Sequence, residues 1–191
     1  MIRGGIVALA FGLASSTAAA GDEVASLRDG HVEITPVAVK DSGTPMMVVR
    51  ALVASPPAKV WAVVSDCAHY AERMPRIVRS ALLESHGNVF TCEVTLSTPF
   101  PMPNLTAVTE ATHEVTAAGM TRTWKLVRGD YVFNEGSWDV RPVDGGGSSL
   151  VTYRVHAEPK VPVPGFLRDM AQRKALPELI ARLRTEASRI P

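Results

Sequence analysis

The chain has 191 residues, of which 46% are hydrophobic and 20% are charged, a composition typical of globular proteins that excludes an intrinsically disordered chain. Its length allows one ordinary domain with appendages. Because 20 basic residues face 19 acidic ones, no clustered basic excess stands out, and we set nucleic-acid binding aside.

Residues 1–20 have the three parts of a secretory signal peptide. Arg3 supplies an early positive charge, an apolar run follows, and Ala18 and Ala20 form an A-x-A cleavage pattern. The apolar run is shorter than the roughly 20 residues of a membrane span, which argues against an anchor or a buried helix. We expect cleavage after Ala20 and a soluble, periplasmic or secreted mature chain.

Alternating hydrophobicity and turn residues predict a sheet of antiparallel hairpins accompanied by a few helices. In chain order, the expected elements are strands 31–40 and 46–54, helices 56–66 and 68–74, strands 77–85, 89–98, 105–116, 120–127, 136–143 and 150–158, and a long amphipathic helix from 165 onward. Ser55 is the expected N-cap of the first helix. Pro177 removes a hydrogen bond from the last helix, so we expect a kink or short break about one turn earlier.

Strand alternation predicts which side chains point to the interior. In strand 89–98 the apolar residues alternate with threonine and glutamate, as in a sheet with one buried face. The predicted inward residues are Phe90, Cys92, Val94, Leu96, Trp124, Leu126, Gly136, Trp138, Val140, Val151, Tyr153 and Val155. Arg154 and His156 are expected to point outward.

Two cysteines, Cys67 and Cys92, would meet an oxidising compartment after export and could pair there. Cys92 lies on the apolar face of its strand, where a free thiol behaves as a small hydrophobic group. We favour unpaired thiols and leave pairing open, because the sequence does not fix the distance between the two Cα atoms.

Motifs for catalysis, metals or cofactors are missing from the sequence. It has no HxxxH or CxxC pair, no G-x-S-x-G elbow and no phosphate- or dinucleotide-binding glycine loop. Asp66, His69 and Glu72 recur at intervals of three, but helix capping and a solvated helix face explain them better than a metal. We expect no catalytic residue, no metal and no cofactor, and favour binding over catalysis.

The terminal helix carries more basic than acidic residues. The basic set is Arg168, Arg173, Lys174, Arg182, Arg184 and Arg189. Because these residues are scattered, we interpret them as a solvated helix face and keep transient contact with a membrane surface as the alternative.

The order of elements resembles the helix-grip fold of the START-like (SRPBCC) superfamily, which includes polyketide cyclases and coenzyme Q-binding proteins. Three stretches carry the resemblance: VRALVASPPAKVWAVVSDCAHYAERMPRIVRSALLE (49–84), NEGSWDVRPVDGGGSSLVTYRV (134–155), and VPVPGF leading to ALPELIARLR (175–184). The resemblance implies an α+β fold in which a curved antiparallel sheet wraps around a long C-terminal helix, with two short helices after the first strand. Together with the signal-peptide pattern, it divides the chain into three expected segments: a signal peptide (1–20), an N-terminal extension with an extra strand (21–45), and a START-like ligand-binding domain (46–191).

A helix-grip sheet also implies a long cavity between sheet and helix. The candidate ligand-binding residues are the large apolar side chains expected inside it or at its mouth: Met74, Phe90, Leu96, Phe100, Trp124, Phe133, Trp138, Tyr153, Phe166 and Met170. For each of them a solid core is the alternative, because cores and apolar sites use the same residue types. The Pro-containing segments 100–103 and 159–166 are expected at the cavity mouth, either as a gate or as rigid loops.

These expectations favour an exported, monomeric binding or carrier protein for a hydrophobic small molecule, such as a lipid, an isoprenoid or a polycyclic compound. Apolar burial at roughly 25 cal/mol per Å² would hold the ligand. The alternative is a cyclase- or dehydratase-type enzyme for a polyketide-like or aromatic substrate, in which Arg122, Glu110 or Tyr153 would move protons. A protein-interaction module with a filled core is the third reading.

Overall fold

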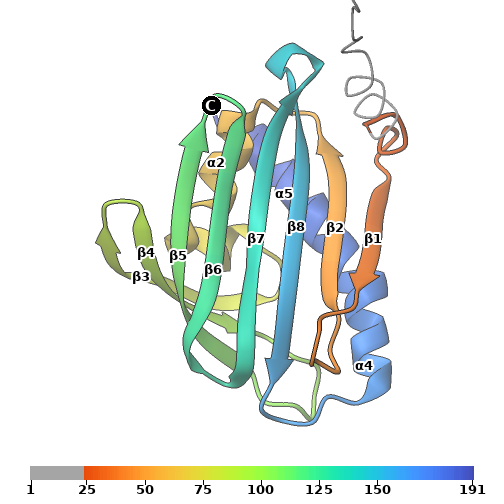
Figure 1. The fold of residues 1–191 in the computed structure, drawn as a ribbon, viewed down its shortest axis with the longest axis vertical. Coiled ribbons are helices and arrows are strands. Elements are labelled where there is room, and N and C mark those ends of the chain that lie inside the picture. Colours follow the sequence, from red (N-terminus) through yellow and green to blue (C-terminus); the bar gives the residue numbers. More distant parts are fainter. Residues whose placement is uncertain (1–23) are drawn as a thin grey trace, which may run out of the picture.

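Eight antiparallel strands form one curved sheet in the computed structural model, which describes residues 24–191 apart from the side chains of 168–172 (Figure 1). The strands are β1 (Val32–Val37), β2 (Met46–Val53), β3 (Ile77–His86), β4 (Val89–Leu96), β5 (Leu105–Thr116), β6 (Gly119–Gly129), β7 (Tyr131–Val143) and β8 (Ser148–Pro159). Their order in the sheet is β1-β2-β8-β7-β6-β5-β4-β3. The expected signal peptide, residues 1–20, lies outside the described residues.

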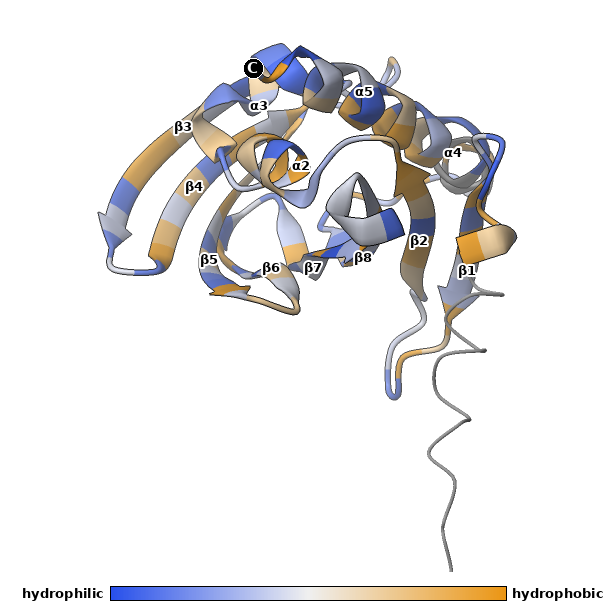
Figure 2. Ribbon diagram, turned by 90° about the horizontal axis from the view of Figure 1, so that it is seen from above, coloured by the Kyte–Doolittle hydropathy of each residue, from blue (hydrophilic) through white to orange (hydrophobic). Residues whose placement is uncertain are grey.

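The helices cover the concave face of this sheet, as the view from above shows (Figure 2). They are α2 (Pro57–Val64), a 3-10 turn (Cys67–His69) and α3 (Tyr70–Arg73) between β2 and β3, then α4 (Gly165–Met170), a π-helical turn (Ala171–Ala175) and α5 (Leu176–Arg189) after β8. The predicted α+β helix-grip arrangement is confirmed. The extra strand β1 pairs with β2 in the same sheet, and the division of the chain at residue 46 stays a prediction.

Proline positions determine where two of the helices begin. Pro57 occupies the first turn of α2, and Pro177 the first turn of α5, where the missing N–H costs no helical hydrogen bond. The π-helical turn directly before α5 confirms the break predicted one turn ahead of Pro177. The expected cap at Ser55 is wrong: Ser55 is buried, and its carbonyl oxygen accepts a 2.7 Å hydrogen bond from Ser149 Oγ.

Arginines of α5 fasten the helix to the rest of the chain. Arg184 donates to the carbonyl oxygens of Leu52 and Gly30, each at 3.0 Å, and burial lowers its pKa. Arg182 donates to the Glu72 carbonyl oxygen at 2.8 Å. The interpretation of these two residues as a solvated face is incomplete, because their partly exposed guanidinium groups also satisfy backbone carbonyls of neighbouring segments.

A disulfide joins Cys67 and Cys92, whose Cα atoms are 6.2 Å apart. Strand alternation placed Cys92 correctly on the inner face, but the preference for unpaired thiols is wrong. The turn that follows α2 crosses the same face of the sheet and brings Cys67 within bonding distance, a proximity between residues 25 apart that no local pattern encodes.

None of the helices within residues 24–191 is long and apolar enough to cross a membrane.

Candidate ligand-binding cavity

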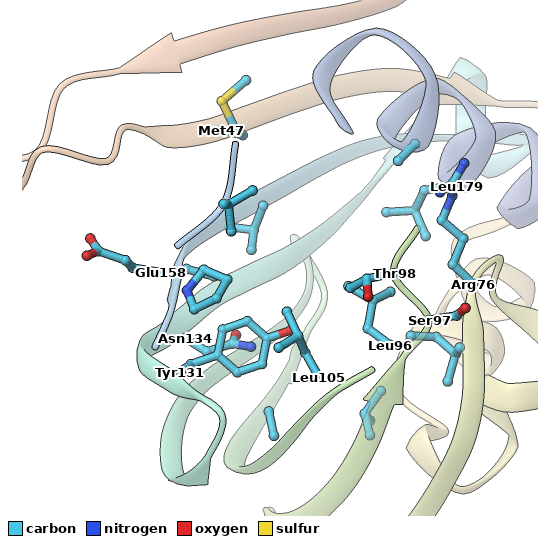
Figure 3. A pocket seen from close by; sticks show the side chains of 18 of the residues that line it. Met47, Arg76, Leu96, Ser97, Thr98, Leu105, Tyr131, Asn134, Glu158 and Leu179 are labelled. Atoms are coloured by element: carbon cyan, nitrogen blue, oxygen red, sulfur yellow. The ribbon is translucent and has the colours of Figure 1, made fainter. Parts of the chain in front are cut away.

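A cavity of about 770 Å³ lies between the concave face of the sheet and the segments that cover it. Strands β4 to β8 contribute its floor, while α3, the crossover 159–163 and the start of α5 contribute the cover. Figure 3 shows Tyr131 and Asn134 on one side of the cavity and Leu96 and Ser97 on another. The volume is within the range of roughly 300 to 1,000 Å³ found for small-molecule sites.

The inner face of the sheet is divided into a solid half and a hollow half. In the solid half, Val63 of α2 and Leu183 of α5 pack with Val140 and Val151 of the sheet, and all four are fully buried. Further along the strands, toward the crossover 159–163, the inward side chains line the cavity instead. The same inward alternation therefore serves as core at one end and as cavity wall at the other.

Five of the ten candidate residues line the cavity: Met74, Leu96, Trp124, Trp138 and Tyr153. Three of them form an aromatic group on the floor, with the ring of Tyr153 lying 4.3 Å from Trp138 and 5.9 Å from Trp124, centroid to centroid. Trp124 Nε1 donates to Asn134 Oδ1 at 3.0 Å. Gly136 makes room for this indole, because a Cβ at position 136 would come within 2.5 Å of Trp124 Cζ2.

Four other candidates lie away from the cavity. Phe90 points inward but stacks on His113 at 4.1 Å in the solid half. Phe133 alternates with the inward residues Asn134 and Gly136, so it lies on the outer face beside His156, with 4.2 Å between ring centroids. Because Val155 and Ala157 line the cavity, His156 between them faces the other side of the sheet, and Phe133 packs there with it.

The two loop phenylalanines among the candidates are exposed to solvent. Phe100 is 95% exposed and Phe166 is 69% exposed, so neither forms part of the cavity wall. The side chain of the tenth candidate, Met170, lies outside the described residues. Met102 of the first Pro-containing segment and Val161 of the second line the same cavity. Their position at its mouth and their action as a gate stay predictions.

Strand alternation also explains the polar lining that the sequence analysis left out. Asn134 is two residues before Gly136 and four before Trp138, so the inward alternation of β7 extends to it. Two tyrosines of the lining were missed for another reason. Tyr70 lies on the short helix α3 and Tyr131 is the first residue of β7, and strand alternation gives no signal at either position. Tyr70 donates a hydrogen bond to the Val64 carbonyl oxygen.

The tyrosines of the cavity keep their protons at neutral pH. Burial, with a smaller contribution from Asp130, raises the pKa of Tyr131 to about 12. Burial also raises the pKa of Tyr153 and of Tyr70. The phenols of Tyr131 and Tyr153 can donate hydrogen bonds to a ligand but are poor bases. Glu110 is exposed between the buried residues Thr109 and Ala111, so it points away from the cavity.

Arg122 brings a buried positive charge to the cavity floor. Its side chain is 3% exposed and lines the cavity, and its Nη2 lies 3.5 Å from Cys92 Sγ. The guanidinium carbon is 5.8 Å from the centroid of the Tyr70 ring and 5.7 Å from that of Trp124. Arg154, by contrast, points outward as predicted and pairs with Asp139.

Residues 53–184 match the protein family described as polyketide cyclase / dehydrase and lipid transport. A comparison with curated proteins finds no match.

Solved structures with the same arrangement of elements include lipid transfer proteins and a cyclase. The STAR-related lipid transfer protein of Xanthomonas axonopodis superposes with a TM-score of 0.71 at 20% identity, over 82% of this chain and 93% of that one. Human STARD10 gives a TM-score of 0.72 at 15% identity, over 84% and 70% of the two chains. The Zhui aromatase/cyclase of Streptomyces sp. R1128 gives 0.60 at 15% identity, over 83% and 95%. At such identities these similarities establish the fold.

Proposed function

The chain belongs to the polyketide cyclase/dehydrase and lipid transport family, and from that premise we propose that it is an exported binding or carrier protein for a hydrophobic small molecule. The ligand is a lipid, an isoprenoid or a polycyclic compound held between the sheet and the C-terminal helix. The protein acts as a monomer.

The cavity is the observation that carries this proposal. Its wall is mainly apolar, with aliphatic residues such as Leu96 and Val155 around the aromatic floor. Every apolar ligand atom that leaves water for such a wall contributes favourably, at about 25 cal/mol per Å² of buried surface. The alternative of a protein-interaction module predicts a filled core, and a cavity of about 770 Å³ does not fit that alternative.

A carrier fits the polar groups of the cavity better than a cyclase or dehydratase does. Proton abstraction needs a base whose pKa is near the working pH. Of the candidates for that role, Glu110 points away from the cavity, burial keeps Tyr153 protonated, and Arg122 carries a positive charge. We therefore keep the enzyme as the second candidate.

Two features support export and delivery. The disulfide between Cys67 and Cys92 supports export, because disulfides persist in oxidising compartments. The exposed rings of Phe100 and Phe166 are close in sequence to the cavity-lining residues Met102 and Leu167, which supports transient contact of the cavity mouth with a membrane surface.

Trp138→Ala tests the proposal against a matched truncation, Phe90→Ala. Trp138 lines the cavity but is only 4% exposed within the buried core, so its loss should weaken binding of a fluorescent fatty acid by about tenfold and also lower the melting temperature strongly. Phe90 is half-buried and lies away from the cavity, so its loss should lower the melting temperature less and leave probe affinity almost unchanged. Phe166→Ala should change neither quantity, because that side chain is mostly exposed.

Thermal denaturation and fluorescence titration of the three variants give the answer. If the wild-type protein binds no fatty-acid or polycyclic probe, or if Phe90→Ala weakens probe binding as much as Trp138→Ala does, the cavity is not a ligand site and the carrier proposal fails.

A further inference from the structure

Arg122 is a buried cation without an anionic partner among the described residues. It is 3% exposed, and its Nε has no hydrogen-bond partner in the part of the chain that the structure describes. Its nearest polar contact is the disulfide sulfur Cys92 Sγ, a weak acceptor, at 3.5 Å. The rings of Tyr70 and Trp124 add cation–π attraction, which is weaker than a carboxylate pair.

A second arginine on the cavity wall, Arg76, differs from Arg122 because an acidic side chain neutralises its charge. Arg76 Nε lies 3.3 Å from Glu178 Oε2, and both side chains reach solvent. Arg122 has neither an acidic partner among the described residues nor appreciable contact with solvent. A guanidinium stays charged in a protein, and a buried charge without a partner destabilises the fold.

We propose that the guanidinium of Arg122 binds an acidic oxygen of the ligand, so that the ligand is an apolar molecule with one carboxylate or one ionised phenol or enol group. This inference rests on the proposed function. An anion completes the set of contacts around Arg122: it accepts from the unpartnered Nε and neutralises the buried charge.

The position of Arg122 also orients the ligand. Arg122 faces Trp138 across neighbouring strands, and Trp138 faces Tyr153, so the charge lies beside the aromatic floor. The phenol of Tyr153, which keeps its proton, can donate a second hydrogen bond to the same anion. The apolar body then extends along Leu105 and Val155 toward the crossover 159–163.

Matched pairs of probes test the inference on the wild-type protein first. One pair is palmitate and 1-hexadecanol, and the other is pyrenebutyrate and pyrenebutanol, each titrated at neutral pH in competition with a fluorescent fatty acid. We expect the acid of at least one pair to bind about tenfold more tightly than its alcohol, since hydrogen bonds to charged groups are the strong ones. The pair that shows the larger ratio identifies an aliphatic or a polycyclic body.

Variants then assign the preference to one side chain. Arg122→Met keeps the bulk of the side chain and should abolish the preference for the acid, while Arg122→Lys should retain part of it. Arg154→Met is the matched control, because it removes an outward-facing arginine that pairs with Asp139 away from the cavity, and it should keep the full preference. Arg122→Met should not lower the melting temperature, because it removes an uncompensated charge.

Each outcome decides the matter. Equal affinity for acid and alcohol in the wild-type protein overturns the role of Arg122 while leaving the proposed carrier function intact. A lower melting temperature of Arg122→Met with an unchanged acid preference makes Arg122 structural. If the wild-type protein binds none of the four probes, the carrier function fails and this inference fails with it. If Arg122→Met does not fold, the wild-type ratio and Arg122→Lys decide.

Discussion

His113 lies at the edge of the solid half, where its imidazole stacks on Phe90 and meets the ring of Trp61 edge-on at 5.1 Å. Its Nε2 is buried without a hydrogen-bond partner among the described residues. Burial and then the positive charge of Arg122 lower the pKa of His113 to about 4. The folded chain therefore holds this imidazole neutral at pH values where an exposed histidine would be half protonated.

The lowered pKa predicts a loss of stability in weak acid. As the pH falls below 6.5, the unfolded chain takes up a proton at position 113 before the folded chain does, so the free energy of unfolding falls until the pH is below about 4. The contribution of His113 is complete above pH 6.5. Urea unfolding at pH 7.5, 5.5 and 4.5 should show this decrease.

His113→Phe is the control, because phenylalanine keeps the ring stacking and does not titrate. The variant should lose less stability than the wild-type protein over the same pH range. An identical pH dependence of the two proteins would show that His113 is not the group responsible.

At the scale of elements, the disulfide fastens the segment after α2 to β4. Cys67 is 3% exposed and Cys92 is fully buried, so the bond is enclosed between the helical segment and the sheet. Tyr70, three residues after Cys67, lines the cavity, and so does Met74. The bond thus holds one part of the cavity wall against the sheet.

Replacing both cysteines by alanine should lower the free energy of unfolding by about 3 kcal/mol, because the unfolded chain regains the freedom of the closed loop. Guanidinium unfolding of the double variant and of the wild-type protein, each with and without reductant, measures this loss. Reductant should destabilise only the wild-type protein. Equal stability of oxidised wild type and double variant would contradict the structural role of the bond.

The order of elements could be predicted because each one leaves a local signal. The alternation in β4 and the turn residues between strands predicted the sheet, and Pro177 predicted the break before α5. Alternation also placed Trp124, Trp138 and Tyr153 on the inner face.

What could not be predicted depends on contacts between distant segments. Alternation assigns Phe90 and Trp138 equally to the inner face, but only the folded structure shows that Trp138 lines the cavity and that Phe90 does not. β7 begins at Tyr131, whereas the predicted strand began at residue 136, so the alternation that puts Phe133 on the outer face was not extended to it. Large apolar residues in loops, such as Phe100, looked like cavity lining because the sequence does not report solvent exposure.

At the scale of the whole molecule, we predict that the mature protein begins at Gly21 or within two residues of it and occurs in the periplasm or the medium. The physical reason is the short apolar run that ends in Ala18 and Ala20, a pattern that signal peptidase recognises. Intact-mass spectrometry of protein from each cell fraction, with and without thiol alkylation, measures the start of the chain and the state of both cysteines. Full-length protein that remains in the cytoplasm would rule this out.

The divided inner face lets this protein change its selectivity without losing its fold. Val140 and Leu183 hold the sheet to α2 and α5 and do not line the cavity, whereas Leu96 and Leu105 line it outside that core cluster. The aromatic floor, such as Trp138, belongs to both. Exchanges of size or shape at Leu96 and Leu105 leave the packing of Val140 and Leu183 untouched. Related proteins with this fold could therefore bind different ligands after a few substitutions in the hollow half, while the residues of the solid half stay the same.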